Sequence, residues 1–334
     1  MTKLHSTPQS TKQKVSSKEV KHNLDTLAQL GKPYESKISD SKAKFQKAAR
    51  RKRLTNAILT KLVPLNSPLQ ESYIRTAYCN EVILQEGSKV SRRYCNNRWC
   101  LVCNSIRTAK AINGYKKPLQ DLGKIYFFTL TIKSVKAKDL RQTITKMYKA
   151  FRDIHHNVLR KKYKIQLKGL RKFECNYNEE ADTFNPHIHF VLSGTPCQLL
   201  LIKSLWLNYF PNETDPEAQN IEEADEETLQ EMFKYFTKIV VNSDFNPIAS
   251  DIIFRAMKGK RVYQSIGIKR VSEEVEMTTS EDIDFQPKQV EIWKYQNYRY
   301  DWVNSRGQAF CDYKPLDKYV RFIDKLEAVK PDKT

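Results

Sequence analysis

The chain has 334 residues, of which 40% are hydrophobic, and its 58 Lys or Arg outnumber 38 Asp or Glu to give a formal net charge of +20. This length allows two domains, or one domain with appendages, around a real hydrophobic core. No run of 18 apolar residues occurs and the lysine-rich N-terminus has no apolar segment. We therefore expect a cytosolic protein with neither a membrane span nor a secretory signal.

The first predicted unit, residues 1–60, is a disordered basic tail. It holds fourteen Lys or Arg against four acidic residues, is rich in Ser, Thr and Gln, and is poor in aromatic residues. A basic tail on a basic chain indicates a polyanionic partner, most often nucleic acid, although a tail that only keeps the protein soluble is the alternative. The run at 51–65 predicts a short helix that ends at Pro64.

The second predicted unit, residues 61–115, is a zinc-binding module. Four of the seven cysteines cluster in it, namely Cys79, Cys95, Cys100 and Cys103. Four thiolates are the ligand set of a closed, structural Zn²⁺ site, and cytosolic cysteines are not expected to form disulfides. A set of free thiols is the alternative. The arginines around the cluster are candidate DNA-binding residues: Arg92, Arg93, Arg98 and Arg107.

The third predicted unit, residues 116–245, has strand and helix patterns in the order β-α-β-β-α, followed by one more helix. Apolar spacing separates the helices from the β-rich runs. The expected strands are at 124–135, 167–178 and 186–193, and the expected helices are at 105–114, 139–161, 197–210 and 225–241. Beyond residue 245 the pattern weakens, so 246–334 is a C-terminal region without a predicted fold.

Two histidines on the strand at 186–193 are candidate metal ligands. Successive side chains of a strand alternate between its faces, so His187 and His189 point the same way. Glu174 lies on the preceding strand of the expected hairpin and can complete the set. Two imidazoles and a carboxylate suit Mn²⁺ or Mg²⁺ acting as a Lewis acid on a phosphate. Structural histidines, or a zinc site, are the alternatives.

The helix at 225–241 has a candidate catalytic face. Glu231, Tyr235 and Lys238 share its polar side, at positions i, i+4 and i+7. A phenol must lose its proton to act as a nucleophile, and a cation one turn away favours that loss. An ordinary solvated polar face is the alternative.

These segments together resemble the plasmid Rep family of rolling-circle replication initiators, which are HUH endonucleases. The runs FFTLTIKSV (127–135), FECNYNEEADTFNPHIHFVL (173–192) and EMFKYFTK (231–238) are similar to the family's three ordered motifs. RYCNNRWCLVCNSIR (93–107) resembles the segment before the first motif. The resemblance covers about residues 75–240. Asn185 departs from it, because many members have a further histidine before Pro186.

The resemblance implies an α+β fold: a central five-stranded antiparallel sheet flanked by helices, the HUH nuclease fold, preceded by the small four-cysteine zinc module. It implies His187 and His189 as ligands of the catalytic ion, with Glu174 matching a glutamate of the family. Tyr235 would be the nucleophile that nicks one DNA strand through a 5′-phosphotyrosyl intermediate. Glu231 would activate water at termination, and Lys238 would steady the charge on phosphate or phenolate.

The implied partner is plasmid origin DNA, single-stranded or extruded as a hairpin, in the bacterial cytoplasm. A host helicase and polymerase are further expected partners, and no membrane is involved. Two alternatives stay open on the sequence. The first is a transposase or mobilisation relaxase of the HUH type with the same chemistry. The second is a non-catalytic zinc DNA-binding regulator with structural histidines.

Overall fold

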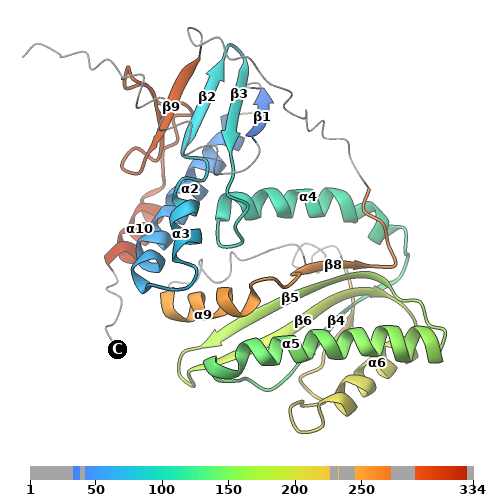
Figure 1. Ribbon diagram of the computed structural model, residues 1–334. Helices are drawn as coiled ribbons and strands as arrows, with labels where there is room; N and C mark the ends of the chain where they lie inside the picture. Colours follow the sequence, from blue (N-terminus) through green and yellow to red (C-terminus); the bar gives the residue numbers. More distant parts are fainter. Residues whose placement is uncertain (1–32, 38–41, 226–231, 233–244, 272–289, 329–334) are drawn as a thin grey trace, which may run out of the picture.

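The computed structural model describes residues 33–37, 42–225, 232, 245–271 and 290–328. Two five-stranded sheets organise this part of the chain (Figure 1). Every strand pairing in them is antiparallel. None of the described helices is both long enough and apolar enough to cross a membrane.

The sheet that carries the two histidines has the strand order β7-β4-β6-β5-β8. Its long central hairpin consists of β5 (Lys168–Asn178) and β6 (Thr183–Ser193). The flanking strands are β4 (Ile125–Thr131), β7 (Ile221–Glu223) and β8 (Tyr263–Ile266). The predicted α+β class, with a five-stranded antiparallel sheet flanked by helices, is confirmed.

Helices cover both faces of this sheet. On one face lie α5 (Ala137–Asp153), its continuation as a π-helix (Ile154–Lys162), and α6 (Pro196–Tyr209), as Figure 1 shows. The predicted apolar stripe of α5, including Leu140, Ile144 and Met147, is fully buried against Phe190 and its neighbours. On the other side lies α4 (Leu101–Gln120), which runs past Gly114 and so extends beyond the predicted helix at 105–114.

The other sheet has the strand order β1-β3-β2-β9-β10. Its strands are β1 (Pro33–Lys37), β2 (Val82–Glu86), β3 (Lys89–Arg93), β9 (Glu291–Gln296) and β10 (Asp301–Val303). Near it lie α2 (Lys42–Leu62), the 3-10 turn Val63–Leu65, α3 (Gln70–Ala77) and α10 (Asp317–Ala328). Helix α9 (Pro247–Met257) packs against both α2 and α5, and so connects the two halves.

The prediction of disorder through residue 60 is wrong for residues 42–60, which form most of α2. The helix predicted at 51–65 is present, but it begins earlier, at Lys42, and ends at Leu62. This helix buries Phe45 and Ala49 despite its many basic residues. Two of those bases are themselves buried and paired with acids distant in sequence. Lys52 pairs with Glu81, and Arg53 with Glu327, each at 2.6 Å. The basic composition predicted disorder because it does not reveal these partners. Residues 1–32 and 38–41 lie outside the described part.

The region 246–334 is not a separate unit, so the predicted boundary at 245 is also wrong. Strand β8 completes the histidine-bearing sheet by pairing with β5. Strand β9 pairs with β2, and α10 packs against α2. The C-terminal region therefore supplies elements to both halves of the molecule. Strand β8, with only four residues, leaves a weak periodic signal in the sequence.

Deleting residues 1–60 should abolish cooperative folding, whereas deleting residues 1–32 should leave it intact. The longer deletion removes most of α2 with Phe45, Ala49 and Ile58, and each large apolar side chain buried there contributes about 2 kcal/mol. Thermal unfolding followed by circular dichroism would compare the two truncations with the full chain. An unchanged melting transition after removal of residues 1–60 would contradict this account of α2.

Candidate metal centres and catalytic face

Three candidate ligands meet on one face of the histidine-bearing sheet. The register of the β5–β6 hairpin places Glu174 directly opposite His187. His189 follows two residues later on β6, so it shares the face of His187. The sequence predicted that these three side chains would come together, and the structure brings them together.

The ligand atoms of this triad point at a common space. Glu174 Oε2 lies 3.5 Å from His187 Nε2 and 3.4 Å from His189 Nε2. The two imidazole centroids are 4.7 Å apart, and one ligand atom from each residue lies within 4.8 Å of the others. His187 is buried, while Glu174 and His189 are partly open to solvent. The arrangement can hold one ion and still admit a substrate.

Neighbouring groups orient both imidazoles. His187 Nδ1 lies 3.1 Å from the backbone oxygen of Asn185. A carbonyl oxygen can only accept, so Nδ1 carries the proton and Nε2 keeps its lone pair for a metal. His189 Nδ1 lies 2.9 Å from the Thr129 hydroxyl, and Phe127 stacks on the His189 ring at 5.1 Å. Both Nε2 atoms therefore face Glu174.

Electrostatics favour a charged carboxylate in the triad. Burial opposes charge on Glu174, but the neighbouring His187 and His189 imidazoles and the ammonium of Lys172 outweigh it, so the pKa of Glu174 lies well below its usual range. Burial lowers the pKa of His189, which favours the neutral imidazole that a metal needs. Lys172 is itself buried and pairs with the second oxygen of Glu174. This donor set fits Mn²⁺ or Mg²⁺.

Asn185 does not extend the triad. Its side-chain amide donates to the backbone oxygen of Ile132 at 3.2 Å. The third donor beside the two histidines is thus Glu174. Sequence reasoning missed the supporting residues Lys172 and Thr129. Lys172 could have been found from its position two residues before Glu174, on the same strand face.

The four clustered cysteines form a second candidate metal centre. Cys79 Sγ lies 3.5 Å from both Cys100 Sγ and Cys103 Sγ, and Cys95 Sγ lies 3.7 Å from Cys103 Sγ. Backbone N–H groups of Cys95, Asn97 and Cys103 donate to the sulfurs. Burial raises the pKa of the Cys79 and Cys100 thiols, so four thiolates in this position need a cation. Four sulfur donors that leave no open coordination position fit a structural Zn²⁺.

The arginines around the cysteines contact other parts of the protein. Arg98 donates to the backbone oxygens of Met257 and Lys260, and Arg107 to those of Asn96 and Asn97. The guanidinium of Arg92 lies 4.6 Å from the centroid of the Phe45 ring. Arg93 ends β3. Their role in DNA binding stays a prediction. The contacts of Arg98 with Met257 and Lys260 gave no signal in the sequence because these residues lie far along the chain.

The three predicted catalytic residues Glu231, Tyr235 and Lys238 lie outside the described residues. Met232 is described, and it is buried in a cluster with Leu119, Ile125, Leu170 and Val191. Leu170 is on the same face of β5 as Glu174, because the two positions are an even number of residues apart. Tyr263 of β8 donates its hydroxyl to the Met232 backbone oxygen at 3.2 Å. Met232 therefore packs on the sheet face that carries the triad.

The segment that carries the triad is similar to part of a known protein family. Residues 88–197 match the model of a family described as replication protein. This segment contains Cys95, Cys100, Cys103 and the whole triad. No solved structure matches the chain.

Curated relatives are replication proteins of bacteria. The chain is 34% identical to a "Protein rep" of Streptococcus pneumoniae over 107 residues, which are 30% of this chain and 32% of that protein. It is 28% identical over 161 residues to one of Staphylococcus aureus, covering 43% of this chain and 69% of the relative. One of Bacillus amyloliquefaciens is 31% identical over 105 residues, 30% of each. The chain thus spans about a third of the length of the pneumococcal relative.

Replacing Thr129 by Val should weaken Mn²⁺ binding about tenfold, because the hydroxyl orients a ligand without touching the ion. Glu174→Gln should weaken it further, because a charged ligand is lost. Electron paramagnetic resonance of free Mn²⁺ during a titration would measure both. Thr131→Val is the matched control, since the Thr131 hydroxyl donates to the backbone oxygens of Ile132 and Pro186. Equal Mn²⁺ affinity for Thr129→Val and Thr131→Val would contradict the role of Thr129 in orienting His189.

The purified protein should contain one zinc ion per chain, held by the four cysteines. Cys100→Ser should lower the zinc content and unfold the surrounding module, because the cluster is almost completely buried. Elemental analysis and thermal unfolding would be measured together, with the exposed Cys197→Ser as a control. Zinc-free protein with an unchanged melting temperature would refute this assignment.

Proposed function

We propose that this chain is a plasmid rolling-circle replication initiator, an HUH-type endonuclease that nicks and rejoins one strand of origin DNA in the bacterial cytoplasm. The observation that carries the proposal is the meeting of Glu174, His187 and His189 on one sheet face, on which Met232 of the segment 231–238 also packs. The match of residues 88–197 to the replication protein family supports it. The substrate would be single-stranded or hairpin origin DNA.

In this proposal the triad holds a catalytic divalent ion. When bound, Mn²⁺ or Mg²⁺ would supply a positive charge that stabilises the phosphate under attack. Lys172 fixes one oxygen of Glu174, which leaves the other oxygen facing the two imidazoles. Thr129 and the Asn185 carbonyl keep both Nε2 atoms directed at the same place. The ligands are thus preorganised before DNA arrives.

The chemical step is a transesterification on the nicked strand. The phenol oxygen of Tyr235 bonds to the phosphorus, and the bond from phosphorus to the 3′ oxygen breaks. The leaving oxygen takes the electron pair and the proton that the phenol gives up, so the products are a 5′-phosphotyrosyl ester and a free 3′-OH. A cation at Lys238 favours the phenolate, and a host helicase and polymerase would extend the 3′-OH.

Termination requires a second nucleophile, and Glu231 with water is our proposal. Glu231 lies one helical turn before Tyr235 in the sequence pattern, so both can reach one phosphate. A carboxylate is suited to taking a proton from water, whereas a phenolate forms a stable covalent ester. Mutations should therefore separate the role of Tyr235 in nicking from the role of Glu231 in termination.

Tyr235→Phe should abolish both nicking and the covalent protein–DNA adduct, because it removes the attacking oxygen while keeping the ring. Glu231→Gln should nick normally but fail to terminate, so that over-length replication products accumulate. Denaturing gels would detect the adduct, and product length during replication would report termination. An adduct formed by Tyr235→Phe would place the nucleophile elsewhere, with Tyr209 and Tyr263 as the next candidates.

A further inference from the structure

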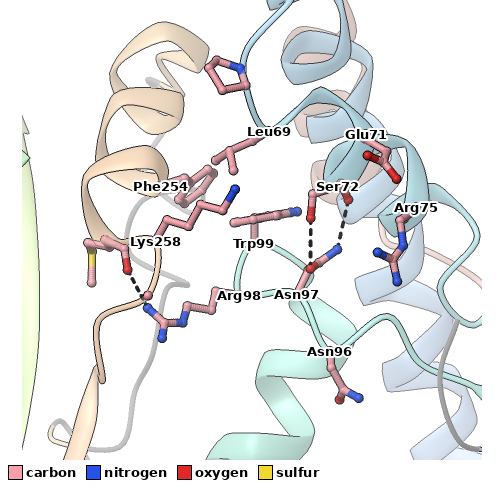
Figure 2. Close-up of a pocket in the computed structure, with 13 residues that line it drawn as sticks. Leu69, Glu71, Ser72, Arg75, Asn96, Asn97, Arg98, Trp99, Phe254 and Lys258 are labelled. Atoms are coloured by element: carbon pink, nitrogen blue, oxygen red, sulfur yellow. Dashed lines mark hydrogen bonds between the residues drawn. The ribbon is translucent and has the colours of Figure 1, made fainter.

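A pocket of about 410 Å³ lies outside the triad, between the two halves of the molecule. Its walls are the start of α3, the loop 96–99 and the C-terminal end of α9 (Figure 2). This volume is in the range of sites that hold small ligands or single nucleotides. The triad mechanism does not use the pocket.

One side of the pocket is apolar and partly aromatic. Leu69, Trp99 and Phe254 line it, and the Trp99 and Phe254 rings lie 5.4 Å apart with a 39° tilt. The indole N–H of Trp99 already donates to the Thr76 hydroxyl at 3.0 Å. Both rings are mostly buried, with 8% of Trp99 and 4% of Phe254 exposed, so they give the pocket a small apolar wall against which the edge of a nucleobase can pack.

The rim of the pocket is cationic. Arg75, Arg98 and Lys258 line it, against the single acid Glu71. Arg98 donates to two backbone oxygens. Neither acceptor is a carboxylate, so these hydrogen bonds do not neutralise the charge of Arg98. Lys258 is exposed, and within the described residues no ion pair involves it. Figure 2 shows its side chain extending from the end of α9 toward Trp99. This excess positive charge favours an anionic ligand.

The pocket adjoins the cysteine cluster. Its loop 96–99 lies between Cys95 and Cys100, so the cysteine cluster fixes the position of Trp99. Its opposite wall, at the end of α9, leads within a few residues to Tyr263 of β8. The Tyr263 ring lies 5.9 Å from the ammonium of Lys172, which pairs with Glu174. A ligand in the pocket would therefore contact the loop between Cys95 and Cys100 and the end of α9.

We propose that this pocket binds one unpaired nucleotide of the DNA strand, with its base against Trp99 and Phe254 and its phosphate near Lys258. The inference rests on the proposed function, because it assumes single-stranded DNA as substrate. A free mononucleotide has the same chemistry as one nucleotide of a strand. The strand is the better source here, because the net charge of +20 attracts a polyanion far more than a single phosphate.

Binding without added divalent ion tests the pocket separately from cleavage. The probe is a fluorescein-labelled dT12 strand, compared by anisotropy with an abasic strand of the same charge and with dTMP as competitor. Wild-type protein should bind dT12 about 5- to 100-fold more tightly than the abasic strand. Lys258→Glu should weaken dT12 binding about tenfold more than Lys138→Glu, an equal change of charge on α5 that controls for long-range attraction.

Photocrosslinking locates the base directly. A strand with a 4-thiothymidine should crosslink to peptides that contain Trp99 or Phe254. Crosslinks found only elsewhere, equal binding of the abasic strand, displacement of dT12 by dTMP at matched nucleotide concentration, or identical behaviour of Lys258→Glu and Lys138→Glu would each overturn the inference. Failure of the proposed function would be distinct: the protein would bind the strand in the pocket and yet never nick origin DNA with Mn²⁺.

Discussion

The pairing of β5 with β6 is the constraint on which the candidate metal site depends. Its register sets Glu174 opposite His187, and the alternation of the strand adds His189 to the same face. A slip of one residue would turn all the side chains of one strand to the opposite face, separating the carboxylate from the imidazoles. The buried residues Phe173, Ile188 and Phe190, which pack on the other face, hold the register.

Long-range contacts then attach the rest of the molecule to this hairpin. Strand β8 extends the sheet beyond β5 and carries Tyr263, whose hydroxyl binds the backbone of Met232. Arg98 fastens the cysteine block to the turn that precedes β8. The C-terminal region therefore packs against both candidate metal centres, and changes there should reach the triad through packing.

Local patterns in the sequence predicted the parts of the structure that depend on neighbours in the chain. Alternation placed His187 and His189 on one face, the hairpin order brought Glu174 beside them, and clustering brought the cysteines together. The errors arose where distant partners decide the outcome. Helix α2 looked disordered because the acids that pair with Lys52 and Arg53 lie far along the chain. Strands β8 and β9 are too short to give a clear periodic signal, so their places in the two sheets could not be predicted from the sequence.

In the proposed function, the triad serves cleavage and not the docking of DNA. The most direct measurement compares wild-type protein with His187→Ala and His189→Ala, at equal zinc content, for Mn²⁺-dependent nicking of supercoiled origin DNA and for affinity to the same DNA. The account predicts that both variants bind DNA as the wild type does and do not nick it. Undiminished nicking by both variants, or loss of binding in step with loss of nicking, would contradict it.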